Sequence, residues 1–445
     1  MLIRFRFKNY TSFKDECVLS LVASPDKALA EENSVEVPSF GKRRLLRSAV
    51  AFGANASGKS NLIQAFAFVR EFVRRSLDED PGSGIPVAPF LLDPESARAP
   101  SEFELAFIHD GVRYDYGLSV DRERVHEEWL IAYPKGLPQK WFERSLPTGN
   151  GTPRWRFGSS LKGEKERLIQ LTRPDSLFLS VAARFNHPQL TGAYGWISDH
   201  LQVLHADTAG WTPRSTAKRA REDAGFRSTL VDLLRFADLG VVGLEVEPVD
   251  RAAALGGLAG DLRNALGTAR NGLDAALRLL GEEPEAFAEA FDVKLKHRTG
   301  DPAAPGVPLQ YDYESEGTRR LFALAAPWLA ALSSGRTLVV DELGASLHPL
   351  LVRLLVGMFH DPRVNTRNAQ LIFDTHDTTL LDPALFRRDQ IWFLEKDPAG
   401  ASHLYPLLDF SPRKDEALAK GYLRGRYGAI PVLGDLDWLG QNGQG

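Results

Sequence analysis

The chain has 445 residues, of which 43% are apolar and 10% aromatic, and its 54 basic and 58 acidic residues give a formal net charge of −4. This length and apolar content suffice for about two to three structural units with a sizeable buried core. The aromatic content and the balanced charge exclude a chain that is disordered throughout. The slightly negative charge excludes a protein that coats nucleic acid with its whole surface, but it leaves room for a local basic groove.

Cysteine content and apolar patterning indicate a cytoplasmic protein. The single cysteine, Cys17, excludes an internal disulfide and a zinc site made of several cysteines, and we expect it to be a buried thiol. No run of about 18 apolar residues occurs, so we expect neither a membrane helix nor a membrane partner. Residues 1–7 alternate apolar and basic side chains, which is typical of a strand and not of a signal peptide.

The first part of the chain is predicted to combine short strands, one helix and a β meander. Residues 1–22 alternate as strands do, and residues 48–52 form a short apolar strand that ends in glycine. Residues 59–77 repeat apolar side chains at helical spacing, and a Pro/Gly-rich break follows at 80–84. Strong alternation between turns over 102–157 predicts an antiparallel meander.

The pattern becomes mostly helical after the meander. Residues 164–204 and 214–237 have helical patterns, and residues 252–291, rich in Ala and Leu, predict a helical hairpin or a short coiled arm. Strands and helices alternate again in the last part, with helices starting near 317 and 348 and strands over 337–340, 370–373 and 390–395.

Residues Gly53–Ser60 match the pattern G-x-x-x-x-G-K-[ST] in full, after a short apolar strand and at the start of a helix. Glycines let backbone N–H groups point at phosphate oxygens, and the helix N-terminus adds partial positive charge. A glycine-rich turn with a surface lysine is the weaker interpretation, because both motif and context are complete. We expect Lys59 to reach the β- and γ-phosphates of ATP and Ser60 to bind Mg²⁺. The predicted nucleotide-binding residues here are Gly53, Asn55, Ala56, Ser57, Gly58, Lys59, Ser60 and Asn61.

A second acidic element follows the apolar strand 337–340. Ligands of open α/β sheets bind at the C-terminal ends of the strands. Asp341 is therefore expected to hold Mg²⁺ through water, and Glu342 to act as general base on the attacking water. Alone, the same pattern would fit a helix cap equally well, and the phosphate-binding motif favours the catalytic interpretation.

Two further segments allow both a functional and a structural interpretation. His376 comes just after an apolar strand, where it could sense the γ-phosphate as a catalytic residue or serve as a structural histidine. Ser315 and Gly317 precede a helix and could form an anion site, but local pattern favours Ser315 as a helix cap. Arg387 and Arg388 could contact phosphates or a partner, or could form structural salt bridges. The basic stretch 214–221 is better explained as a solvated helix face than as a nucleic-acid site.

The order of these elements resembles that of ABC-type ATPases of the SMC, recombination-repair and OLD kind. Residues 341–349 look like the Walker B motif and D-loop of that class, and His376 matches its switch histidine. The resemblance implies an α/β fold, an ABC/SMC-type P-loop ATPase head with an antiparallel β meander and a helical insertion. It also implies a homodimer or higher homo-oligomer, in which Ser315 and Gly317 of one subunit close over the nucleotide bound to the other.

Segments 314–320, 346–349, 387–393 and 425–431 resemble more closely the prokaryotic AAA-family ATPases of abortive-infection operons, which include AbiL-like, RloA-like and, more distantly, PARIS-like proteins. That resemblance implies an anti-phage switch that controls a separately encoded effector, often a Toprim-type nuclease, and responds to a phage protein or nucleic acid. No acidic cluster follows Asp377, so we assign no nuclease site to this chain.

The sequence departs from the usual ABC-type ATPase pattern in its signature and its Q-loop, and two other functions are possible. Glu316 and Thr318 replace the Gly and Gln of the transporter signature, and no glutamine between Ser76 and Pro100 offers a Q-loop ligand. An SMC/RecF-like DNA-repair ATPase is the alternative function, although its arm would be short. A transporter subunit is disfavoured by the long insertion before the signature. The expected divisions are an N-terminal ATPase lobe (1–100), the meander (101–160), a helical insertion or lid (161–300), a C-terminal ATPase lobe (301–400) and a tail (401–445).

Overall fold

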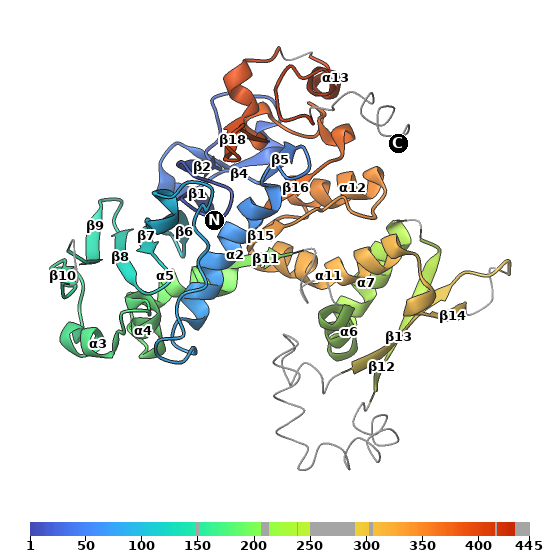
Figure 1. The fold of residues 1–445 in the computed structure, drawn as a ribbon. Helices are drawn as coiled ribbons and strands as arrows, with labels where there is room; N and C mark the ends of the chain where they lie inside the picture. The colour runs from blue at the N-terminus through green and yellow to red at the C-terminus, as the bar shows by residue number, and fades with distance from the viewer. Residues whose placement is uncertain are drawn as a thin grey trace, which may run out of the picture. The chain divides into compact units, whose positions relative to one another are not determined.

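The structure, a computed structural model, forms two compact units (Figure 1). Unit 1 comprises Met1–Gly210 and Ala330–Gly445, and unit 2 comprises Trp211–Leu329. The residues that the structure describes are 1–147, 151–205, 213–237, 239–249, 290–301, 306–413 and 416–431.

A six-stranded sheet lies at the centre of unit 1, in the order β11-β15-β16-β5-β17-β18. The first five strands of that order run parallel, and β18 pairs antiparallel with β17. Every residue of β5, β15 and β16 is buried, which explains why these strands are nearly continuous apolar runs. Their bounds are β5 Ser48–Gly53, β11 Leu201–Leu204, β15 Thr337–Val340, β16 Gln370–Thr375, β17 Ile391–Lys396 and β18 Ser402–Pro406.

The register of this sheet aligns the C-terminal ends of three strands. Phe373 of β16 pairs with Val50 of β5 on one side and with Val340 of β15 on the other. The segments that follow β5, β15 and β16 therefore emerge side by side at one edge of the sheet.

The predicted meander is confirmed as part of a seven-stranded antiparallel sheet, in the order β10-β9-β8-β7-β6-β1-β2. The N-terminal strands add to it because β1 pairs with β6, far along the chain. The bounds are β1 Leu2–Lys8, β2 Cys17–Ser20, β6 Ser101–His109, β7 Val112–Val120, β8 Val125–Tyr133, β9 Gln139–Ser145 and β10 Arg154–Phe157. A separate ribbon joins β3 (Ser34–Glu36) to β4 (Arg44–Leu46). Cys17 is buried, and burial raises the pKa of its thiol, as expected for a structural cysteine.

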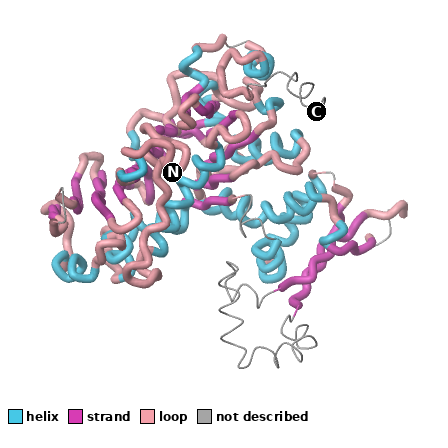
Figure 2. Tube along the Cα trace, viewed as in Figure 1, coloured by secondary structure: helices cyan, strands magenta, loops and turns pink. Residues whose placement is uncertain are grey.

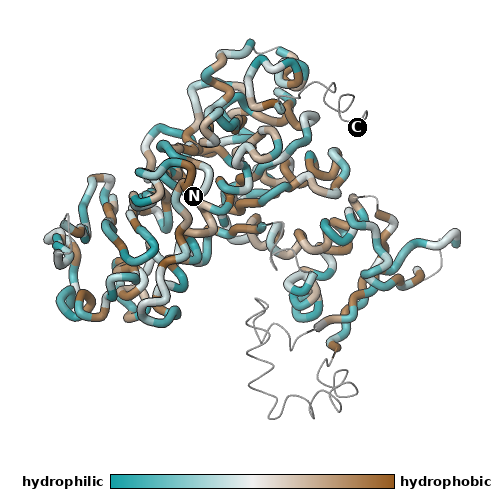
Figure 3. Tube along the Cα trace, viewed as in Figure 1, coloured by the Kyte–Doolittle hydropathy of each residue, from teal (hydrophilic) through white to brown (hydrophobic). Residues whose placement is uncertain are grey.

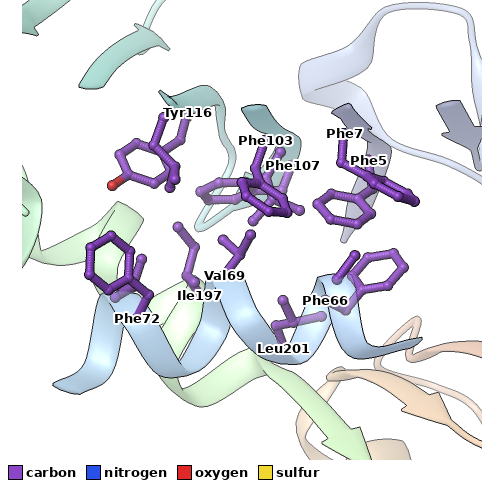
Figure 4. Packing of buried hydrophobic residues seen from close by; sticks show 14 of the residues in the cluster. Phe5, Phe7, Phe66, Val69, Phe72, Phe103, Phe107, Tyr116, Ile197 and Leu201 are labelled. Carbon is purple, nitrogen blue, oxygen red and sulfur yellow. The ribbon is translucent and has the colours of Figure 1, made fainter. Parts of the chain in front are cut away.

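Helix α2 (Lys59–Arg75) supplies much of the core of unit 1. Figure 4 shows Phe66, Val69 and Phe72 of this helix facing aromatic side chains of the seven-stranded sheet. The rings of Phe66 and Phe5 lie 4.1 Å apart between centroids. Buried residues of the central sheet belong to the same cluster, so α2 ties both sheets to the loop at its own N-terminus.

The helices expected over 164–204 are present up to residue 200. They are α3 (Lys165–Leu171), α4 (Phe178–Arg184), α5 (Thr191–Gly195) and a π-helical turn Trp196–His200. A short helix, α1 (Ala30–Asn33), lies earlier in the chain. Residues 201–204, however, form β11, which extends the central sheet beside β15. The segment is too short for its apolar pattern to separate a strand from a helix.

Unit 2 differs from the expected helical insertion, because it mixes helices with strands (Figure 2). Helices α6 (Pro213–Glu222) and α7 (Ala224–Phe236) are followed by an antiparallel sheet in the order β12-β13-β14, and α11 (Glu316–Ser334) begins here. Its strands are β12 Val241–Val249, β13 Ala290–His297 and β14 Val307–Gln310. Val and Leu alternate with charged residues in β12, a period of two that favours a strand. The predicted hairpin over 252–291 lies outside the described residues, apart from its end in β13.

The C-terminal part contains α12 (Pro349–His360) and α13 (Leu418–Leu423). Strand β18 falls in the expected tail but forms the edge of the central sheet. Figure 3 shows how apolar and polar segments alternate along the trace. No helix in the described ranges is both long and apolar enough to cross a membrane.

Candidate functional site

The loop between β5 and α2 has the backbone shape that its glycines allow. Gly58 precedes the helix with φ of 108°, and Ala56 has φ of 61°. A Cβ on Gly53 would lie 2.4 Å from the carbonyl oxygen of Leu394, so β17 leaves no room for a side chain there. A Cβ on Gly58 would lie 2.4 Å from Ser402 Oγ. Close packing therefore requires glycine at both ends of the loop, and at Gly58 the positive φ requires it as well.

Lys59 folds back into this loop. Its side chain is buried, and Nζ donates hydrogen bonds to the carbonyl oxygens of Gly53 at 3.0 Å and Ala54 at 2.9 Å. Burial lowers the pKa of the Lys59 ammonium, and three nearby carboxylates only partly offset that effect. The ammonium is therefore already placed inside the loop, where phosphate oxygens could replace its two carbonyl partners.

Asp341 lies at the C-terminal end of β15, beside the loop. Burial raises the pKa of its carboxyl, but hydrogen bonds with His205 and Ser60 outweigh burial, so the pKa lies below its usual value. His205 Nδ1 is 3.9 Å from Asp341 Oδ2. The tertiary structure thus joins Ser60 and Asp341, the two side chains predicted to hold Mg²⁺.

The oxygen atoms around Asp341 fit a magnesium ion. Asp341 Oδ1 and Asp374 Oδ2 are buried, and within the described part of the chain no other residue donates a hydrogen bond to them. The two carboxyls lie close enough for each to act on the pKa of the other. Hard oxygen ligands of this kind suit Mg²⁺, which usually keeps several waters and phosphate ligands. Among the described residues there is no cluster of three or more His, Cys, Asp or Glu side chains that could hold a metal. Ser60 and Asp341 would therefore hold the ion together with water and nucleotide.

Glu342 adopts an uncommon backbone conformation. Its φ of 50° lies in the left-handed region, which costs free energy for any residue with a Cβ. Its N–H donates to Asp374 Oδ1 at 3.0 Å. Its charge acts on the pKa values of both Lys59 and His376, so its carboxylate lies near the phosphate-binding loop. This is the neighbourhood that a general base would need.

Asp374 was not among the predicted site residues. It is fully buried in β16, and burial together with the charge of Asp341 raises its pKa to about 8. An acidic residue within an otherwise apolar strand was the signal that could have identified it, because a buried carboxyl needs specific partners.

His376 lies close to Lys59 and to the Gly53 backbone at the start of the loop. The residue is exposed overall, but partial desolvation of its imidazole and the charge of Lys59 lower its pKa, while Glu342 and a hydrogen bond with the Gly53 backbone oppose this shift. The histidine is thus adjacent to the phosphate-binding loop and could contact a bound phosphate.

The remaining predicted residues differ in their settings. Asn55 and Ala56 are exposed at the tip of the loop, whereas Ser57 is buried. Asn61 is half-buried, and its Nδ2 donates to Ser12 Oγ at 2.7 Å. In unit 2, Ser315 Oγ accepts the N–H of Thr318 at 3.1 Å, so it caps α11 as the local pattern favoured. Gly317 lies in the first turn of that helix.

Arg387 and Arg388 form ion pairs within unit 1. Arg387 is buried and makes a paired contact with Asp389, with Nε and Nη2 at 2.9 and 2.7 Å from the carboxylate oxygens. Arg388 pairs with Asp26. Both guanidinium groups are therefore engaged within unit 1.

Three of the solved structures similar to this chain are SMC heads. The SMC head domain from Thermotoga maritima is 12% identical, with a TM-score of 0.38, 91% of this chain covered and 98% of that chain. An SmcHead bound to the C-winged helix domain of ScpA is 12% identical, with a TM-score of 0.42 and coverage of 91% and 97%. An Smc head with an extended coiled coil, bound to the C-terminal domain of ScpA derived from Pyrococcus furiosus, is 12% identical, with a TM-score of 0.36 and coverage of 92% and 97%. No curated protein matches the chain.

The predicted α/β head with an antiparallel β meander is confirmed by the strand order of the two sheets, and not by likenesses as distant as these. A family model matches residues 49–174 and 272–382, which include the phosphate-binding loop, Asp341, Glu342 and His376. The match covers more than half of the chain. The chain therefore belongs to the family described as "AAA domain, putative AbiEii toxin, Type IV TA system".

Proposed function

We propose that unit 1 binds and hydrolyses ATP with Mg²⁺. The observation that supports this most strongly is the convergence of Lys59, Asp341, Glu342 and His376 at the ends of three adjacent parallel strands. These residues come from three distant parts of the chain, and a purely structural role would not require all of them at one sheet edge.

Each residue has a distinct role in the proposed reaction. Lys59 leaves its carbonyl partners for the β- and γ-phosphates, and Ser60 and Asp341 hold the ion directly or through water. A Mg²⁺ held there would neutralise charge that develops on the phosphates. Glu342 takes a proton from the water that attacks the γ-phosphorus, the bond from that phosphorus to the β-phosphate oxygen breaks, and ADP leaves. His376 contacts the γ-phosphate.

Two substitutions test this chemistry. Lys59→Ala should weaken ATP binding about tenfold or more, because it removes a cation from the phosphates. Glu342→Gln should keep binding and lower hydrolysis by about 10²–10⁴-fold, because it removes only the base. Binding is measured with a fluorescent ATP analogue and hydrolysis by phosphate release, with and without EDTA. Asp361→Asn, at the end of α12, is the control carboxylate. Hydrolysis by Glu342→Gln at the wild-type rate would contradict the role of the base.

We further propose that the ATPase is a cytoplasmic dimer switch of an anti-phage system and controls a separately encoded effector, such as a nuclease. Support comes from the abortive-infection resemblance of four segments and from the family description, which names a toxin of a toxin–antitoxin system. ATP that binds a closed dimer more tightly than an open one shifts a bound partner between two states.

Phage plating tests the two-component arrangement. The arms are the ATPase alone, the neighbouring effector gene alone, both together, and both with Lys59→Ala. We expect protection only with both wild-type genes. Protection by the ATPase alone would contradict the separate effector, and protection that survives Lys59→Ala would contradict nucleotide control.

Dimer closure depends in this proposal on Ser315 and Gly317 of the second subunit. Gly317→Glu should leave ATP binding intact and prevent ATP-dependent dimerisation, measured by light scattering with Glu342→Gln as the non-hydrolysing background. Gly357→Glu on α12, where a Cβ meets open space, is the matched control. ATP-dependent dimerisation by Gly317→Glu would support a capping role alone for this segment.

A further inference from the structure

Asp374 connects the two strands that carry the proposed catalytic residues. It lies in β16, between the strand of the phosphate-binding loop and β15, and its side chain is fully buried. Its Oδ1 accepts the N–H of Glu342 at 3.0 Å, and its main-chain oxygen accepts the N–H of Leu343 at 3.2 Å. Two consecutive peptide groups after Asp341 are therefore bound to a single residue.

The backbone that Asp374 binds, at Glu342 and Leu343, includes a residue in an unfavourable conformation. Glu342 has φ of 50°, and a residue with a Cβ stays in that region only when its surroundings determine the conformation. Two other features also hold this segment in place. The Ala345 N–H donates to the Glu342 carbonyl oxygen at 3.0 Å, and the Leu343 side chain is buried. Neither of these restrains the N–H of Glu342 itself, which is the group that Asp374 binds.

We propose that Asp374 is a positioning residue, which holds Glu342 in its left-handed conformation and thereby directs the proposed base toward the phosphate-binding loop. The effect of Asp374 on catalysis rests on the proposed ATP hydrolysis, whereas its effect on the backbone of Glu342 does not. If the N–H bond were lost, the backbone at Glu342 could relax to a negative φ, and its carboxylate would leave the neighbourhood of Lys59 and His376.

Two variants separate this role from others. Asp374→Asn keeps an oxygen that accepts the Glu342 N–H, whereas Asp374→Ala removes it. A supporting contact of this kind typically contributes about 10–100-fold to activity, so Asp374→Ala should lower kcat by about that factor with little change in the affinity for an ATP analogue. Asp374→Asn should retain most of kcat.

A matched control tests whether the loss of any buried carboxylate would have the same effect. Glu128 in β8 is also fully buried and accepts two backbone N–H groups, those of Phe178 and Leu179 at 2.7 and 2.9 Å. Glu128→Gln should leave kcat near the wild-type value, since its partners lie in α4 and not at the site.

Hydrogen exchange on the nucleotide-free protein gives a measurement that does not depend on activity. The amides of Glu342 and Leu343, followed in a peptide that covers 338–347, should be protected in the wild type and in Asp374→Asn. In Asp374→Ala the Glu342 amide should lose protection. If Asp374→Ala proves insoluble, Asp374→Asn is compared with Asp374→Ser, whose shorter side chain does not reach that N–H.

Three results would overturn the proposal: unchanged kcat in Asp374→Ala, unchanged exchange of Glu342 in that variant, or an equal loss of kcat in the Ala and Asn variants. The last would assign the effect to the charge of the carboxylate and not to its hydrogen bond. If the proposed function itself is wrong, the wild-type protein will not hydrolyse ATP. Hydrogen exchange at the Glu342 amide can still be measured in that case, so it tests the role of Asp374 separately.

Discussion

Acid should destabilise this protein through one buried histidine, His360 at the end of α12. Its Nε2 lies 2.8 Å from Ser48 Oγ, at the start of the strand that leads to the phosphate-binding loop. Gln390 Nε2 donates to the same Ser48 Oγ at 2.7 Å. In the neutral tautomer whose Nε2 carries no proton, His360 accepts the serine hydroxyl, and Gln390 Nε2 lies 3.4 Å from the same nitrogen. Burial, and to a lesser degree the charge of Arg47, lowers the pKa of His360 from 6.5 to about 3.

The sign and size of the effect follow from that shift. A histidine whose pKa is lower in the folded than in the unfolded state contributes stability above the unfolded value, and this stability is lost as pH falls from about 6.5 toward 3. Each pH unit in that window corresponds to about 1.4 kcal/mol. At about pH 4.5 the folded protein should therefore have lost about 2.7 kcal/mol through His360 alone.

The comparison with His360→Gln isolates this contribution, because glutamine stays neutral while every other titrating group is shared. The free energy of unfolding of the nucleotide-free protein is measured by urea denaturation at about pH 7.5 and about pH 4.5. The wild type should lose about 2–3 kcal/mol more than His360→Gln between the two conditions. Equal losses in the two proteins would refute the reasoning, since His360 would then take up no extra proton on unfolding.

Three further outcomes test the fold and the site. Arg387→Met should cost about 3–5 kcal/mol in urea denaturation, because Asp389 would remain buried without its cation; a loss below about 1 kcal/mol would mean that the pair is dispensable. Gly53→Ala should abolish binding of an ATP analogue while the protein stays folded by circular dichroism, since its Cβ would lie 2.4 Å from the Leu394 carbonyl oxygen; normal binding would show that the loop adjusts. Asp341→Asn should raise the Mg²⁺ concentration needed for half-maximal hydrolysis by about 10–100-fold, and an unchanged requirement would exclude Asp341 from the metal site.

Features that depend on a few consecutive residues could be predicted from the sequence. The phosphate-binding motif Gly53–Ser60 includes its own context, an apolar strand before it and a helical period after it. The meander over 102–157 was predicted for the same reason, since a period of two is visible along each strand. Ser315 was favoured as a helix cap by local pattern, and it does bond the Thr318 N–H.

Other features needed the partner of each residue, and no local pattern identifies that partner. Arg388 pairs with Asp26, 362 residues away in the chain, so the sequence left a phosphate contact and a salt bridge equally plausible. The four residues of β11 contain too little of either period to distinguish a strand from a helix, and only their pairing with β15 gives them a strand's hydrogen bonds.

The geometry of the candidate site depends most on tertiary structure. Motif order along the chain indicated which residues act together, since Asp341, Glu342 and His376 each follow a buried strand. The packing of the parallel strands decided that β16 lies between β5 and β15, because each crossover can return to either side of the sheet. That position brings Asp374 onto the N–H of Glu342, a contact between residues 32 apart in sequence, which tertiary structure alone creates.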